Sequence, residues 1–114
     1  MVTVHQINRL VNGIILNGTA PDQGFSHCFA SDLMSNVLTV DKEGMILLTG
    51  LSTLQTMRTA EMSNVHCVIV ARGKRVTNEM LKLAKEHGIA VIFCSFSMFA
   101  ASGRLYENGI KPVY

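Results

Sequence analysis

The stretch HCVIVARG, residues 66–73, is a continuous apolar run that ends in a glycine turn and precedes a helical pattern over 77–87. Two similar units flank it: MILLTG at 45–50 before 52–64, and IAVIFCS at 89–95 before 97–108. Short runs rich in β-branched residues are typical of strands buried on both faces, and strands alternating with helices form parallel sheets. We therefore expect ligands to bind at the carboxyl edge of such a sheet.

Short polar patterns predict where the remaining elements lie. Residues 3–6 form a capping box before a first helix, short strands are expected at 14–16 and 25–30, and a loop is expected at 19–24. Polar residues predict the helix starts and glycines the ends, with starts at Thr3, Ser52, Thr77 and Ser97 and ends at Gly13, Gly88 and Gly109. Ser52 and Gln55 have the spacing of a second capping box, and Ser31-Asp32 is an N-cap pair before a short helix. The fold class expected over residues 1–114 is a single three-layer α/β domain, with a mostly parallel sheet of about five strands and helices on both faces.

Composition excludes several classes of function. The chain has 114 residues, of which 48% are hydrophobic and 16% charged, with a net charge of +2 and no Trp. No basic stripe with interleaved aromatic residues is present, which argues against nucleic-acid binding. Three separate cysteines, an odd number without a C-x-x-C pair, are typical of reduced core residues. No signal peptide is visible, and the apolar stretch 89–101 is too short for a membrane span, so we expect a cytoplasmic protein.

The leading candidate site is the carboxyl edge of the predicted sheet. Helix N-termini and turn glycines there would suit a phosphate or carboxylate, and Arg72 would add a bidentate contact. The ligand-binding candidates follow the predicted strands: Ser31, Asp32, Thr49, Gly50, Ser52, Arg72, Gly73, Ser95 and Ser97. The alternative is that these residues are ordinary helix caps and turn glycines, with Ser31-Asp32 serving only the helix that follows.

Catalytic and metal sites find little support in the sequence. His27 and Cys28 are adjacent in a predicted strand, so their side chains point to opposite faces and do not form a nucleophile–base pair. The four histidines lack the spacing of metal ligands. We therefore expect no catalytic residue, no metal and no cofactor. The apolar stretch 93–101 contains more aromatic residues than a core needs, and predicts a self-complementary patch for a twofold dimer.

Four stretches resemble the DRTGG domain, the module that also forms the N-terminal part of bacterial HPr kinase/phosphorylase. They are residues 24–37 with ASDLMSNV at 30–37, ILLTG at 46–50, VARG at 70–73 with the helix at 77–88, and SMF at 97–99 with GRLY at 103–106. Two departures stand out. Phe25 replaces the second glycine of the family's Gly-Gly pair, and Leu51-Ser52 stands where the family often has Asp-Arg.

The resemblance implies a stand-alone regulatory domain. Related copies occur beside CBS domains in regulated pyrophosphatases. The phosphate-binding motif of a kinase, G-x-x-x-x-G-K-[ST], is absent, because GIILNGT at 13–19 lacks the lysine. The expected function is a non-enzymatic, homodimeric ligand-sensing module for a small anionic metabolite or adenine nucleotide. The alternative is a protein-interaction adaptor that docks on a metabolic or redox enzyme, such as a hydrogenase of an anaerobe.

Overall fold

The computed structural model describes residues 1–18 and 24–114, so the loop predicted at 19–24 lies almost wholly outside the described residues. The described elements follow one another as α1 (Val4–Leu10), β1 (Ile14–Asn17), β2 (His27–Ala30), α2 (Met34–Val37), β3 (Met45–Thr49), α3 (Leu54–Met62), β4 (Cys67–Val70), α4 (Asn78–Glu86), β5 (Ala90–Phe93), α5 (Met98–Glu107) and β6 (Lys111–Pro112). The three strand-then-helix units predicted between residues 45 and 108 are therefore confirmed.

The strands form one mostly parallel sheet, as predicted. Their order is β1-β5-β4-β3-β2-β6, and only β1 runs antiparallel, against β5. The sheet has six strands, one more than expected. The additional strand, β6, is the two-residue segment Lys111–Pro112 beside β2, and a segment this short carries no readable periodicity. Its proline is tolerated because β6 is an edge strand.

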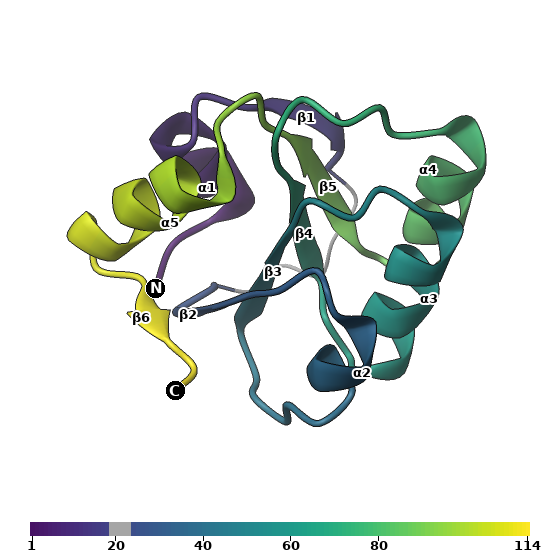
Figure 1. Ribbon diagram of the computed structural model, residues 1–114, viewed down its shortest axis with the longest axis horizontal. Coiled ribbons are helices and arrows are strands. Elements are labelled where there is room, and N and C mark those ends of the chain that lie inside the picture. The colour runs from purple at the N-terminus through teal and green to yellow at the C-terminus, as the bar shows by residue number, and fades with distance from the viewer. Residues whose placement is uncertain (19–23) are drawn as a thin grey trace.

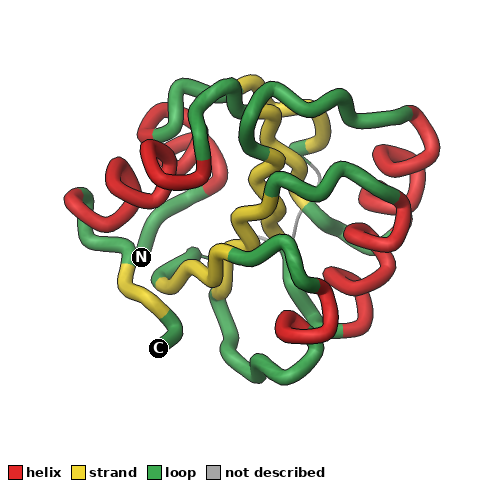
Figure 2. Tube along the Cα trace, viewed as in Figure 1, coloured by secondary structure: helices red, strands yellow, loops and turns green. Residues whose placement is uncertain are grey.

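Helices cover both faces of the sheet, which confirms the three-layer prediction. Helices α1 and α5 lie on one face, and α2, α3 and α4 lie on the other (Figure 1; Figure 2 marks the same layers by colour). Alternate strand residues face the two layers. Ile46 and Leu48 of β3 join the core beneath α1 and α5, whereas Met45 and Leu47 join the core beneath the other helices. Both cores contain fully buried side chains, so the central strands are apolar on both faces.

Most of the predicted helix caps are present. The Thr3–Gln6 capping box is formed, the Thr77 side chain accepts from the backbone N–H of Met80, and the Ser97 side chain accepts from that of Ala100.

The cap predictions for the start of α3 and the end of α1 are wrong. Helix α3 is capped by Thr53 instead of Ser52, because Ser52 donates its hydroxyl to the carbonyl of Arg75. After α1 the residue at positive φ is Asn12 instead of Gly13. Gly13 is needed for space, since an added Cβ would lie 2.6 Å from Ile92 Cγ2 and 2.9 Å from the carbonyl oxygen of Phe93.

Candidate functional site

Parallel topology brings the ends of four strands to one edge of the sheet. Strands β2, β3, β4 and β5 lie side by side in this order and run parallel to one another. The residues that follow them therefore share this edge. Every candidate predicted from the sequence lies in these segments or at the helix starts just after them. Within this edge, side-chain contacts join only some of the candidates.

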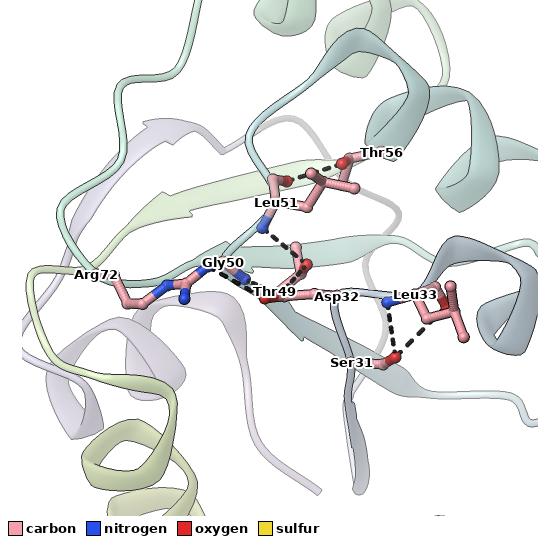
Figure 3. Close-up of polar contacts among 8 residues, drawn as sticks. All are labelled: Ser31, Asp32, Leu33, Thr49, Gly50, Leu51, Thr56 and Arg72. Atoms are coloured by element: carbon pink, nitrogen blue, oxygen red, sulfur yellow. Dashed lines mark hydrogen bonds and ion pairs between the residues drawn. The ribbon is translucent and has the colours of Figure 1, made fainter.

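Asp32 is the centre of the contacts at this edge. One carboxylate oxygen, Oδ1, accepts from the Thr49 hydroxyl at 3.1 Å and from the backbone N–H of Gly50 at 2.6 Å. The other oxygen, Oδ2, accepts from Arg72 Nη2 at 3.1 Å (Figure 3). Asp32 therefore ties together the ends of β2, β3 and β4, which are three neighbouring strands. The expectation that Ser31-Asp32 caps the next helix is wrong, because α2 has no side-chain cap and Ser31 accepts from Leu33 two residues on.

Thr49 and Thr56 extend this network into the protein. The Thr49 hydroxyl also accepts from the backbone N–H of Leu51 at 3.1 Å, and the Thr56 hydroxyl donates to the Leu51 carbonyl at 2.8 Å (Figure 3). Both threonine side chains are buried, so each hydroxyl needs the partner it has. The turn after β3 is consequently held at both of its backbone polar groups.

Arg72 occupies a conformation that arginine rarely adopts. Its φ is +64° and that of Gly73 is +65°, two consecutive positive values as in a type I′ turn. Such turns favour Asn-Gly, and the other two non-glycine residues at positive φ in the described ranges are Asn12 and Asn64. The backbone N–H of Arg72 donates to the Phe96 carbonyl at 2.8 Å, and that of Gly73 donates to the Cys94 carbonyl at 2.9 Å. These bonds fix the turn against the segment after β5.

The guanidinium of Arg72 reaches from this turn across Gly50 to Asp32. A Cβ on Gly50 would coincide with the guanidinium, so the arginine lies directly over the glycine backbone. The side chains of Arg72 and Asp32 are 46% and 44% exposed, so the pair faces solvent. Only Nη2 of the guanidinium has a partner among the described residues, which leaves the N–H groups of Nε and Nη1 for another acceptor.

The structure thus brings together four of the predicted residues, Asp32, Thr49, Gly50 and Arg72, and we call this group the Asp32–Arg72 cluster. The backbone N–H groups of Gly50, Arg72 and Gly73 are all occupied inside the protein, so the turns at this edge form no cradle of open amides. Ser31 and Ser97 make local contacts instead, Ser52 donates to the distant carbonyl of Arg75, and Ser95 is exposed. Thr56 could not be found from the sequence, because its role depends on its bond to a carbonyl five residues away.

The remaining candidates from the sequence are His27 and the cysteines. His27 Nδ1 lies 2.7 Å from the Ser26 hydroxyl, and burial with nearby Lys42 and Lys111 lowers the pKa of His27. Burial raises the pKa of the Cys28 thiol to about 12 and also raises that of Cys94. Among the described residues no three His, Cys, Asp or Glu side chains gather as metal ligands, and no described helix has the length and apolar character to cross a membrane.

Comparisons with known proteins give a match among solved structures. No family model and no curated protein matches the chain. Among solved structures, the fold is similar to the CBS and DRTGG domains of the regulatory region of Clostridium perfringens pyrophosphatase, which was solved with its activator diadenosine tetraphosphate. The TM-score is 0.71 and the identity 19% over 98% of this chain, which spans about half (48%) of the other. The likeness establishes that this chain shares its fold with the matched half of that regulatory region.

Proposed function

We propose that this chain is a non-enzymatic regulatory domain of the DRTGG type that senses a small anionic metabolite, with adenine nucleotides as the first class to test. The Asp32–Arg72 cluster is the binding site in this proposal. A homodimer is the expected form of the protein.

The observation that carries the proposal is the position of Arg72. Its guanidinium is half exposed, is held in place by Gly50 and Asp32, and keeps donors for a second acceptor. The exposed side chains of Lys74 and Arg75 follow it at once, which makes this turn the most basic stretch of the sequence. A phosphate group is the ligand that suits a fixed guanidinium beside two further cations.

Two further arguments favour a nucleotide over other anions. The sequence resembles the DRTGG domain, and the solved regulatory region with the same fold binds diadenosine tetraphosphate as its activator.

A thermal-shift screen with AMP, ADP, ATP, diadenosine tetraphosphate and inorganic phosphate tests the proposal. A ligand present at about 100 times its dissociation constant stabilises the native state by about 2.7 kcal/mol, a shift of several degrees for a domain of this size. We expect at least one nucleotide to give this shift and phosphate alone to give a smaller one. No shift with any of these compounds would overturn the proposal.

Arg72→Asn is the variant that assigns the response to the cluster. Asparagine suits positive φ, so the turn is retained while the guanidinium is lost. The matched control is Lys85→Asn, which removes a cation from the last turn of α4, at the opposite edge of the sheet. We expect Arg72→Asn to abolish the nucleotide shift and Lys85→Asn to retain it. Equal responses of the two variants would remove Arg72 from the site.

The adaptor function remains the second candidate. The observation in its favour is exposed apolar surface on α5, where the Phe99 side chain is 90% exposed. An adaptor would show no nucleotide shift and would form a stoichiometric complex with its enzyme, as measured by light scattering.

A further inference from the structure

Helix α5 carries two large aromatic side chains that nothing in the described part of the chain covers. Phe99 is 90% exposed and Tyr106 is 69% exposed. They are seven residues apart, or two helical turns, so they lie on the same side of the helix. The buried residues of α5, Ala101 and Leu105, lie on another side and face the sheet. Exposed aromatic pairs of this kind are typical of protein–protein interfaces.

Small residues occupy the helix surface between the two aromatic side chains. Ser102 and Gly103 lie at spacings of three and four from both Phe99 and Tyr106, so the four residues form one continuous face. A Cβ added at Gly103 would meet no atom within 4 Å, so the helix surface is open at this point. Small residues allow two helices to approach closely, while the aromatic residues at either end supply the contact area.

A groove continues this face toward the edge of the sheet. It has a volume of about 290 Å³ and lies between α5 and the segments of β2 and β6, with Ser102 and Tyr106 on one wall and Phe29, Pro112 and Tyr114 on the other. Helix α5 and β6 are neighbours at one side of the molecule (Figure 1). The walls are mainly apolar, and the Tyr114 side chain, in edge-on contact with Phe29 at 5.9 Å between ring centroids, is 82% exposed.

We propose that α5 is the interface of a twofold homodimer, in which Phe99 of each copy packs against Tyr106 of the other at the mouth of this groove. The sequence Phe-x-x-Ser-Gly-x-x-Tyr at 99–106 reads similarly from both ends. An axis between Ser102 and Gly103 therefore places each aromatic residue opposite the other and each small residue opposite a small one. The inference specifies the homodimer of the proposed function and does not depend on the anion site.

Charge complementarity favours a second copy over an unrelated partner. Helix α5 has no acidic residue in its first turn, so the positive end of its dipole is uncompensated within the helix. In the antiparallel arrangement Glu107 of each copy lies opposite Met98 of the other, in that first turn. Each helix thus receives from its partner the negative charge that its own N-terminus lacks.

The available area predicts a dimer of modest affinity. Phe99, Tyr106 and Tyr114 of two copies together contribute about 900 Å² if each aromatic side chain buries about 150 Å². Specific stable interfaces bury about 1,200–2,000 Å² in total, so these side chains and their immediate neighbours reach only the lower end. We expect a dissociation constant on the order of micromolar, and hence monomers in dilute samples.

Sedimentation velocity across protein concentrations from about 1 to 500 μM tests the interface. The average mass should rise from 12.5 kDa toward twice that value. Gly103→Arg should raise the dissociation constant at least tenfold, because its side chain has open space in the monomer and none between two helices. Phe99→Glu should do the same. The control Met62→Glu alters a side chain that is 70% exposed on α3, at the other face of the sheet, and should leave dimerisation unchanged.

A wild-type chain that stays monomeric throughout this range, or a Gly103→Arg dimer as tight as wild type, would overturn the proposal. Nucleotide shifts measured on the Gly103→Arg monomer keep the two proposals separate, since that variant retains the Asp32–Arg72 cluster.

Disulfide trapping tests the antiparallel orientation. A mixture of Phe99→Cys and Tyr106→Cys chains should form a disulfide-linked heterodimer on oxidation, because the two positions face each other. Either variant alone places its two thiols about 10 Å apart along the helices, too far for a disulfide bond. Equal cross-linking of each variant alone, or a dimer that the mixture does not cross-link, would refute this arrangement.

Discussion

The guanidinium of Arg72 occupies the space in which a side chain on Gly50 would begin. The two residues follow neighbouring parallel strands, β3 and β4, and lie 22 positions apart in the sequence. Gly50 is absent from the residues with positive φ, so its lack of a side chain serves the arginine and not the backbone conformation. Gly50 looks like an ordinary turn glycine in the sequence, but its role is to leave room for the Arg72 guanidinium over its backbone.

Gly50→Ala should displace Arg72 from Asp32. The new methyl group takes the place of the guanidinium, so the half-exposed ion pair is lost at a cost of at most about 1 kcal/mol of stability. If the cluster binds nucleotides, their thermal shift should disappear as well. The control is Gly103→Ala, which should raise the free energy of unfolding by up to about 1 kcal/mol and keep the shift. A full nucleotide response in Gly50→Ala would contradict the assigned role of Arg72.

Asp32→Ala should lower the free energy of unfolding by about 1–3 kcal/mol, as measured by urea denaturation. The substitution leaves the Thr49 hydroxyl and the Gly50 backbone N–H without their acceptor, and unpaired polar groups carry a penalty of this size. Asp32→Asn retains one acceptor oxygen and should lose less. Since either change removes a negative charge beside Arg72, anions should bind more tightly to the Asn variant. Stability unchanged in the Ala variant would show that Asp32 does not hold the three strand ends together.

His27 should make the protein less stable in mild acid. Burial, Lys42 and Lys111 lower its pKa below the ordinary 6.5, so the unfolded chain takes up a proton before the native state does. The stability that His27 contributes is therefore complete above about pH 6.5 and falls as the pH drops toward the lower native pKa. Urea denaturation at about pH 7.5 and 5.5 should show a smaller loss for His27→Gln than for wild type. An identical loss in both proteins would place the acid sensitivity elsewhere.

The three thiols should resist modification in the native protein. Cys67 and Cys94 are fully buried, and burial raises the pKa of Cys28 to about 12, so almost no thiolate exists near pH 8. Ellman's reagent should therefore react with all three cysteines in denaturant and with none rapidly in the native state. Rapid reaction of one native thiol would support a nucleophilic function, against which the sequence argues.

The fold could be predicted because its signals are local and repeated. Buried strands such as Cys67–Val70 can be recognised by their apolar composition. Capping residues such as Thr77 bond a backbone group only three positions away. The wrong predictions concern residues whose role is determined by a contact with a residue far away in the sequence. Ser52 looks like a cap and instead bonds the carbonyl of Arg75, while Gly13 looks like a helix stop and instead gives room to Ile92.

The sequence predicts where the candidate site lies, but it does not predict the hydrogen bonds and the ion pair within the site. Parallel topology alone placed Asp32 and Arg72 at one edge, yet their contact spans 40 positions and no sequence pattern encodes it. The function that local rules assigned to Asp32, a helix cap, was wrong because the carboxylate finds better donors on β3. Pairings of this kind depend on the register between strands, which composition and periodicity leave open.

The turn after β4 offers a way to find such sites in related chains. Left-handed backbone at a residue other than glycine or asparagine carries a penalty of about 1–3 kcal/mol. Arg72 adopts this conformation at a position where glycine or asparagine would carry a smaller penalty. A design procedure that optimises stability would replace this arginine with glycine or asparagine. The resulting protein would have a higher free energy of unfolding and would lack the Arg72 guanidinium. If the proposed anion site is correct, retention of a basic residue at this left-handed position marks the related chains that keep it.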